Sequence, residues 1–311
     1  EWKFNIAANV QAICEEEIVK VFELTKQLVP ETDNCVYMGG VALNCVANSI
    51  IARDHYPNLW ILPNPGDAGS SLGSAAYLFG EHINWTSPFT GYDIRGKYPT
   101  TKVLNELLKG NIVGVASGRA EFGPRALGAR SILGDARSSN MQKNLNLKVK
   151  YRESFRPFAP SILQENLSDW FDLDIKSPYM LLVSEVRSDK CIKMSEDEKN
   201  LFGIDKLNIK RSEIPAVTHV DYSARIQTVD GNYNFKYFKL LNKFKDKTSC
   251  PILINTSFNV RGEPIVLSPD DAFRCFMGTN LDLLAIGNCI LEKKDQNPSL
   301  RKNYKDRFKL D

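Results

Sequence analysis

Residues 118–135 read GRAEFGPRALGARSILGD, and they carry three arginines and four glycines within one short window. A second basic stretch, RESFRPFAP, follows at residues 152–160. Guanidinium groups bind phosphate and carboxylate groups through two parallel hydrogen bonds, and glycines let the backbone approach a ligand closely. The two stretches together predict a site that holds a polyanionic small molecule.

The charge around these stretches is locally basic, although the net charge of the chain is only +3. Residues 119–156 contain nine lysines and arginines but three acids. Such a field suits an anionic small molecule or a nucleic acid. Solvated surface charge is the usual alternative, but the prolines and phenylalanines between these arginines restrict the backbone, which favours a fixed binding site.

The composition is that of a soluble globular protein, with 43% hydrophobic and 25% charged residues among 311. We expect no membrane span, because no run of about 18 apolar residues occurs. The seven cysteines are scattered and form no Cys-x-x-Cys pair, which favours reduced thiols of a cytoplasmic protein over a disulfide framework or a zinc site. The chain starts at Glu1 rather than at Met, so we expect a piece of a longer protein.

The hydrophobic patterns predict an α/β fold, in which helices alternate with short buried strands. The first part is predicted to contain helices at residues 5–28, 44–56 and 66–79 and strands at 35–38 and 59–62. Residues 86–100 are rich in Pro, Gly, Thr and Tyr, and we place a domain boundary there, between 95 and 96. The second part is predicted to contain helices at 102–108, at 138–147 and from 268, and strands at 112–116, 179–186, 224–229, 251–255 and 283–290.

Two motifs of the first part are candidates for ligand binding. Gly39 and Gly40 end a predicted strand just before the helix that Asn44 begins, so their backbone N–H groups suit a phosphate or a hydroxyl. A tight strand–helix turn explains the glycine pair equally well. Asp67 at a helix start suits a metal or a ribose, although an N-cap is the simpler interpretation of this residue in isolation. The three histidines of the chain are not spaced as a pair on one helix face, so the sequence alone completes no metal site.

Two groups of polar residues in the second part are further candidates. His219 and Asp221 lie two residues apart and share one side of an extended segment. They suit an acid/base pair or ligand contacts, and a polar strand-edge pair with Arg225 as its counter-ion is an equal alternative. Asn255 and Ser257 end a buried strand, where ligand sites of α/β proteins often lie. An Asx or Ser/Thr turn is the alternative for these two residues.

In their order along the chain, these motifs resemble those of the NodU-type O-carbamoyltransferases, which include nodulation-factor and antibiotic carbamoyltransferases. The resemblance covers nearly the whole chain and is carried by GPRALG at 123–128, FRPFAP at 155–160, PAVTHVD at 215–221 and NTSFN at 255–259. It implies the end of an actin-like (ASKHA) α/β part at residues 1–95. A YrdC-like α/β domain with a twisted mixed sheet is implied at residues 96–311.

The resemblance also implies a reaction. The YrdC-like part of such enzymes joins carbamoyl phosphate and ATP into carbamoyl-adenylate, with release of pyrophosphate and phosphate. The actin-like part then moves the carbamoyl group to a hydroxyl of a sugar, nodulation factor or antibiotic, using an iron(II)-type metal, and Mg²⁺ is expected to accompany the ATP. Because the chain begins partway into the actin-like part, we expect carbamoyl-adenylate formation without efficient transfer.

By position, the resemblance assigns the carbamoyl-phosphate and ATP site to Arg125, Lys150, Arg156, Arg225, Asn255 and Ser257. We expect Arg125 and Arg156 to hold phosphates, and Lys150 to lie near the reacting carbamoyl phosphate. Asn255 and Ser257 are expected to orient the carbamoyl group or the nucleotide. The remaining binding candidates are Arg130, Arg152, His219 and Asp221, together with Gly39, Gly40 and Asn44 in the nucleotide loop of the actin-like part. Asp67 matches a metal-ligand aspartate of that part.

The expected small-molecule partners are carbamoyl phosphate, ATP and a hydroxyl acceptor, in a cytoplasmic protein without membrane contact. A separately encoded N-terminal half and a second copy of the chain, as a homodimer, are the protein partners considered. Two other function classes stay open at this point: an RNA-binding module and a non-catalytic partner of a complete carbamoyltransferase. The basic stretch lacks interleaved exposed aromatics of the stacking kind, which weighs against RNA.

Overall fold

The computed structural model describes residues 2–153, 155–201, 204–207 and 209–301. The chain divides into two compact units: unit 1 is Glu1–Asn84 with Leu181–Val183, and unit 2 is Trp85–Met180 with Ser184–Asp311. The division follows Asn84, whereas the sequence predicted a boundary after residue 95, because residues 89–94 form a strand that pairs within unit 2. None of the helices in the described ranges combines the length and the apolar character that a membrane span requires.

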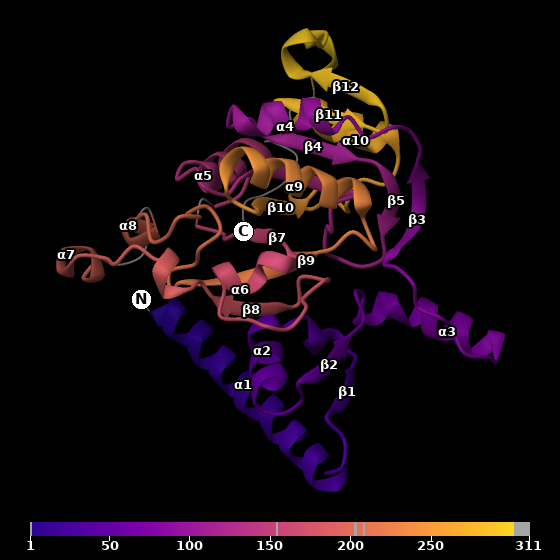
Figure 1. Ribbon diagram of the computed structural model, residues 1–311, viewed down its shortest axis with the longest axis vertical. Coiled ribbons are helices and arrows are strands. Elements are labelled where there is room, and N and C mark those ends of the chain that lie inside the picture. The colour runs from indigo at the N-terminus through magenta and orange to yellow at the C-terminus, as the bar shows by residue number, and fades with distance from the viewer. Residues whose placement is uncertain (1, 154, 202–203, 208, 302–311) are drawn as a thin grey trace. The chain divides into compact units, whose positions relative to one another are not determined.

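Unit 1 is built on a short parallel sheet of β1 (Asn34–Tyr37) and β2 (Asn58–Ile61) (Figure 1). Its helices are α1 (Trp2–Leu28), α2 (Cys45–Asp54) and α3 (Ser70–Phe79). A small core joins Phe22 of α1 to Ile51 and Tyr56. The helix–strand order predicted for this part of the chain is confirmed.

A large mixed sheet of eight strands carries the core of unit 2, in the order β12-β11-β4-β6-β10-β7-β9-β8 (Figure 1). The strands are β4 (Val113–Ala116), β6 (Arg130–Asp135), β7 (Ala159–Leu163), β8 (Leu182–Glu185), β9 (Ser223–Val229), β10 (Ile252–Ser257), β11 (Leu283–Ile286) and β12 (Cys289–Glu292). The β4–β11 and β7–β9 pairs are parallel, and the β4–β6, β6–β10, β7–β10 and β11–β12 pairs are antiparallel. A separate antiparallel ribbon joins β3 (Phe89–Ile94) to β5 (Gly118–Glu121). The α/β class with a mixed sheet is thus confirmed.

Three longer helices pack on the strands of unit 2: α4 (Thr100–Leu108), α9 (Phe235–Thr248) and α10 (Pro269–Gly278). α9 contacts α4, β7 and β10, and α10 contacts β4 and β11. A capping box between Ser268 and Asp271 begins α10 where the sequence predicted a helix start. The shorter helices are α5 (Met141–Leu145), which continues into a π-helical turn at Asn146–Lys150, α6 (Leu167–Trp170), α7 (Glu196–Lys199) and α8 (Ile204–Leu207).

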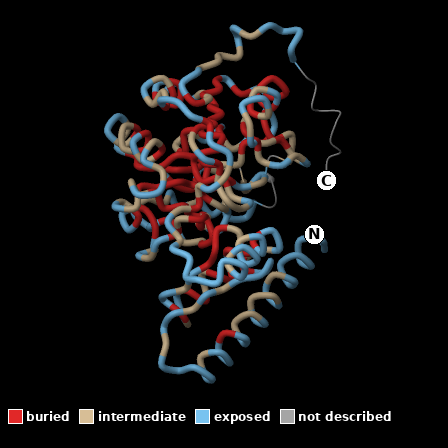
Figure 2. Tube along the Cα trace, turned by 90° about the vertical axis from the view of Figure 1, so that its right-hand side faces the viewer, coloured by how far each residue is buried: buried red, intermediate tan, exposed pale blue. Residues whose placement is uncertain are grey.

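The core of unit 2 lies along its central strands. Every residue of β4, β6 and β7 is buried, and Figure 2 shows buried chain gathered in this part of the molecule. From α9, Tyr237, Leu240 and Phe244 add their side chains at helical spacing. The candidate site is held by β9 and β10 of this sheet and by the loop that follows β5 of the separate ribbon.

The single strand predicted at residues 283–290 is wrong, because the chain reverses within it. β11 and β12 pair in antiparallel fashion on either side of Gly287 and Asn288. Gly287 has a φ of +54°, and a Cβ there would lie 2.3 Å from the carbonyl oxygen of Arg95. Only glycine fits this turn. The strand prediction followed the hydrophobic residues on both sides of Gly287 and did not take this glycine as a turn signal.

Candidate functional site

A cleft of about 300 Å³ in unit 2, here called the arginine cleft, gathers most of the predicted site residues. Its lining residues are Pro124, Arg125, Ala126, Arg152, Arg156, Pro157, Phe158, Ala159, Met180, Arg225, Asn255, Thr256 and Ser257. Four of them are arginines, and none of the described residues that line the cleft is a carboxylate. A concave surface lined by several guanidinium groups is suited to bind an anion.

The arginines of the cleft come from three separate segments. Arg125 belongs to the loop after β5, Arg152 and Arg156 follow the π-helical turn, and Arg225 lies on β9. Burial, together with the positive charges of Arg156 and Arg225, lowers the pKa of Arg152 to about 10. The fold therefore brings like charges close enough to repel one another, and an anionic ligand would relieve this repulsion.

Neighbouring side chains hold two of these guanidinium groups. Arg152 donates from Nε to Asn146 Oδ1 over 2.7 Å, and its guanidinium carbon lies 4.9 Å from the ring centroid of Phe158. Arg156 donates from Nε to Glu153 Oε2 over 2.9 Å. In the described part of the chain, Arg125 Nε is buried and has no hydrogen-bond partner. Because a buried donor without a partner is costly, this atom is a candidate to donate to a ligand.

Glu121 organises the loop that carries Arg125. Its Oε1 accepts the backbone N–H groups of Leu127, Ala129 and Arg130 at 2.7, 2.8 and 3.1 Å, and the N–H of Gly128 donates to Ser131 Oγ. The glycine-rich window therefore turns the N–H groups of residues 127–130 inward rather than towards a ligand. Side chains, not these backbone groups, are left to hold an anion in the cleft.

Replacement of Glu121 should lower the free energy of unfolding, and the loss should be larger for Glu121→Ala than for Glu121→Gln. Hydrogen bonds to a charged acceptor contribute about 1.5–3 kcal/mol each, so we expect Glu121→Ala to lower the free energy of unfolding by about 3 kcal/mol or more. Glu121→Gln keeps an acceptor oxygen without the charge and should lose less. Urea unfolding of both variants measures the two losses, and equal stability of Glu121→Ala and the wild type would contradict this role.

Asn255 presents a buried acceptor at the cleft. Its Nδ2 donates to the carbonyl oxygen of Ala126 over 3.0 Å and to Gln227 Oε1 over 2.7 Å. Its Oδ1 is buried and has no hydrogen-bond partner among the described residues. Asn255 is only 1% exposed, so the amide orientation leaves an oxygen available for a ligand that offers an N–H or O–H group.

Lys150 does not line the arginine cleft but lies buried behind Ser257. Its Nζ donates to the carbonyl and side-chain oxygens of Ser257 and Asn259, with 3.1 Å to Ser257 Oγ and 2.8 Å to Asn259 Oδ1. Burial lowers the pKa of Lys150 to about 7. In this position Lys150 holds the Ser257 segment of the cleft wall, and direct contact with carbamoyl phosphate stays a prediction.

The lowered pKa of Lys150 predicts a pH-dependent contribution to stability. The unfolded chain holds the proton up to about pH 10.5 and the folded chain only to about 7. The contribution of Lys150 to the free energy of unfolding is therefore largest above pH 10.5, where Lys150 is neutral in both states, and it is lost as the pH falls through 7. We expect the stability of the wild type relative to Lys150→Met to rise between pH 7 and 9, by at most about 1.4 kcal/mol per pH unit. Urea unfolding at both pH values tests this, and a pH-independent difference would contradict it.

Arg130 is placed away from the lining of the arginine cleft. It is fully buried, and its guanidinium donates to the backbone carbonyls of Leu267, Gly118, Ala129 and Tyr92. This set of acceptors makes Arg130 a structural clamp between segments. The residue borders a second hollow of about 450 Å³, and Pro124 lines both this hollow and the cleft.

His219 and Asp221 also lie outside the cleft lining. Ser223 links them: His219 Nδ1 is 3.0 Å from Ser223 Oγ, and Asp221 Oδ1 accepts both the N–H and the hydroxyl of Ser223. Burial lowers the pKa of His219. These bonds form a turn before β9. Both ligand contact and a strand-edge pair with Arg225 as counter-ion stay predictions.

The candidates of unit 1 form their own local structures. Gly39 has a φ of +111°, Gly40 begins a 3₁₀ turn, and Asn44 caps α2 by accepting the N–H of Ala47 over 3.2 Å. Asp67 is exposed at the start of another 3₁₀ turn. No cluster of three or more His, Cys, Asp or Glu side chains within the described ranges is arranged to hold a metal ion. Asp67 therefore belongs to no complete metal site among the described residues, and its role as a metal ligand stays a prediction.

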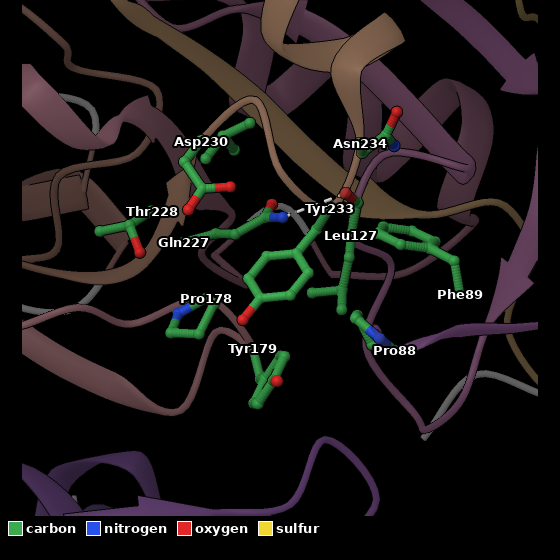
Figure 3. A pocket seen from close by; sticks show the side chains of 11 residues that line it. Pro88, Phe89, Leu127, Pro178, Tyr179, Gln227, Thr228, Asp230, Tyr233 and Asn234 are labelled. Carbon is green, nitrogen blue, oxygen red and sulfur yellow. Dashed lines mark hydrogen bonds between the residues drawn. The ribbon is translucent and has the colours of Figure 1, made fainter. Parts of the chain in front are cut away.

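A small aromatic cavity lies on another side of the cleft wall (Figure 3). It is lined by Pro88, Phe89, Leu127, Pro178, Tyr179, Gln227, Thr228, Val229, Asp230, Tyr233 and Asn234. At about 20 Å³ it has room for roughly one water molecule. The cavity is too small for a phosphorylated substrate, but it contains Gln227, the hydrogen-bond partner of Asn255.

Comparison with known proteins finds two family matches along the chain. Residues 104–293 match the family described as Carbamoyltransferase C-terminus, and residues 1–76 match Carbamoyltransferase N-terminus. The uncharacterized protein sll1178 of Synechocystis is 43% identical over 99% of this chain and 55% of that protein. The nodulation protein NolO of Bradyrhizobium diazoefficiens is 34% identical over 93% of this chain and 55% of that protein.

A further relative is named as an enzyme. The 3'-hydroxymethylcephem-O-carbamoyltransferase of Streptomyces clavuligerus is 31% identical over 88% of this chain and 52% of that protein. The chain spans about half the length of the curated relatives it matches. A crystal structure of full-length HypF aligns with 15% identity and a TM-score of 0.38 over 61% of this chain and 21% of that one, a similarity too low to support an argument. Because the C-terminal family match alone covers more than half of its residues, the chain belongs to the carbamoyltransferase family.

Proposed function

We propose that this protein activates a carbamoyl group by forming carbamoyl-adenylate from carbamoyl phosphate and ATP. The observation that carries the proposal is the arginine cleft, in which four arginines and the buried acceptor of Asn255 meet without a lining carboxylate among the described residues. The ligand that matches this surface has phosphate charge and a hydrogen-bond donor. Carbamoyl phosphate has both, in its phosphate and its NH₂ group.

The proposed reaction brings together two phosphorylated molecules that repel each other. Water splits carbamoyl phosphate into carbamate and phosphate, and a carbamate oxygen then attacks the α-phosphorus of ATP while pyrophosphate leaves. Arg125, Arg156 and Arg225 offset the charge of both reactants and of the departing groups, which favours their approach and stabilises the transition state. The second hollow beyond Pro124, bordered by Ile265, Val266 and Leu267, offers an apolar surface for the nucleoside of ATP.

The second half of the proposal is transfer to a hydroxyl of a small molecule. It rests on family membership and on the similarity to the 3'-hydroxymethylcephem-O-carbamoyltransferase. Mg²⁺ would enter with ATP as part of the substrate. Since the described residues around Asp67 form no complete metal site, no step is assigned to an iron. Gly39, Gly40 and Asn44 are proposed to bind a nucleotide for this transfer step.

Exchange of labelled pyrophosphate into ATP tests the proposed activation. The purified 311-residue protein should catalyse exchange only when carbamoyl phosphate is present, because carbamoyl-adenylate must form for pyrophosphate to return to ATP. Acetyl phosphate serves as the matched control, since it carries the phosphate without the NH₂ group. Exchange that is independent of carbamoyl phosphate, or no exchange in protein that binds ATP, would overturn the proposal.

A further inference from the structure

Gln227 links the arginine cleft to the aromatic cavity behind it. It lies on β9 two residues after Arg225, so both side chains project from the same face of the strand. Gln227 is only 3% exposed. Figure 3 shows its amide next to the side chain of Tyr233, with a dashed line from its nitrogen to the backbone oxygen of Leu127, while its oxygen accepts from Asn255 of the cleft.

The hydrogen bonds of Gln227 fix the orientation of its amide group. Nε2 donates to the carbonyl oxygen of Leu127 over 3.1 Å, and a carbonyl can only accept. Oε1 must therefore face the opposite way, where it accepts from Ser161 Oγ at 2.5 Å and from Asn255 Nδ2 at 2.7 Å. All three contacts agree with one orientation, and a flipped amide would place donors against donors and acceptors against acceptors.

The orientation of Gln227 determines what Asn255 offers to the cleft. Because Gln227 Oε1 only accepts, it draws the NH₂ end of Asn255 towards itself and towards the carbonyl of Ala126. The oxygen end of Asn255 is thereby left as the buried acceptor without a partner among the described residues. Gln227 and Asn255 also bind the carbonyls of Leu127 and Ala126, so the same pair holds the backbone just after Arg125.

We propose that Gln227 is a positioning residue that makes Asn255 accept an N–H group of the substrate, so that the cleft prefers carbamoyl phosphate over acetyl phosphate. This inference rests on the proposed function. Acetyl phosphate has a methyl group in place of the NH₂ group, and it would leave Asn255 Oδ1 buried without a hydrogen bond. A site with an unmatched buried polar atom rejects such an analogue.

Binding of carbamoyl phosphate and acetyl phosphate to the full 311-residue protein, measured by calorimetry, tests the inference. We expect the wild type to prefer carbamoyl phosphate about tenfold or more. Gln227→Met removes the closer of the two acceptors of Asn255 and leaves only the carbonyl oxygen of Ala126, so it should lower this ratio through weaker binding of carbamoyl phosphate. Gln227→Glu is the matched control. Burial against the carbonyl of Leu127 favours the neutral carboxyl group, which donates to that carbonyl through its O–H and still accepts from Asn255 and Ser161. The ratio should stay within about twofold of the wild type.

The outcomes separate this inference from the proposed function. Equal loss of affinity for both ligands in Gln227→Met would indicate a structural role only and would overturn the inference. A wild type that binds both ligands equally also overturns it, while carbamoyl-phosphate chemistry stands. A wild type that binds neither ligand overturns the proposed function. If Gln227→Met does not fold, Gln227→Glu decides: a retained preference supports the role, and a lost preference refutes it.

Discussion

Arg125→Ala should reduce carbamoyl-phosphate-dependent exchange of pyrophosphate into ATP by about 100-fold or more, the usual effect of removing one donor that stabilises transition-state charge. Arg125 lines the cleft, and its Nε is buried without a hydrogen-bond partner among the described residues. The substitution removes a guanidinium group from the cleft lining, and the described residues accept no hydrogen bond from its Nε. We therefore expect a loss of activity with little loss of stability.

Arg119→Ala is the matched control for this substitution. Arg119 lies in the same sequence window, but it is exposed on β5, donates to the carbonyl oxygen of Thr90 and is absent from the cleft lining. The pyrophosphate–ATP exchange rate of Arg119→Ala should stay near that of the wild type. Arg125→Lys keeps the charge without the planar fork and should fall between the two. Equal exchange rates for Arg125→Ala and Arg119→Ala would rule out a role for Arg125 in the reaction.

Arg130→Met should lower the free energy of unfolding by about 4 kcal/mol or more, because it leaves buried carbonyls without donors. The guanidinium of Arg130 donates to four backbone carbonyls in three segments of unit 2. Methionine fills most of the volume but offers no hydrogen bond. The loss is expected without any ligand present, since Arg130 does not line the arginine cleft.

Urea unfolding without nucleotide measures this effect, with Arg119→Met as the control. The exposed side chain of Arg119 donates to the carbonyl oxygen of Thr90, so its loss should cost about 1 kcal/mol or less. If Arg130→Met unfolds like the wild type but fails to bind ATP, the clamp is wrong and the sequence-based assignment of Arg130 to cofactor binding is right.

The fold was predictable where apolar runs end in glycine or proline, as at β1, β2 and β4. It was less predictable in the centre of the large sheet. β6 was hidden inside the arginine window because buried Arg130 and Asp135 make the strand read as polar. β7 contains Pro160, which pairs with Ile254 in the middle of the sheet, although proline usually marks an edge or an end of a strand. In both strands, burial in the folded protein decided the structure, although the local sequence pattern did not indicate a strand.

The sequence predicted which residue types form the candidate site, but it did not predict how these residues are arranged in space. Arg125, Arg225 and Asn255 come from distant parts of the sequence and meet because β9, β7 and β10 are neighbours in the sheet. No spacing along the chain indicates that order. Glu121 and Gln227 were missed, since an acid in a basic window and an amide in a strand read as ordinary. The period of two from Arg225 to Gln227 was the available signal.

The contacts of Glu121 have a consequence for the energetics of ligand capture. Its carboxylate and Ser131 hold the loop of residues 127–130 in one conformation through bonds that need no ligand. Loops that close around an anion lose conformational entropy at that moment, whereas this loop has already lost it during folding. An anion that binds in the arginine cleft therefore does not have to order this loop, so less of the interaction free energy is offset by lost conformational entropy.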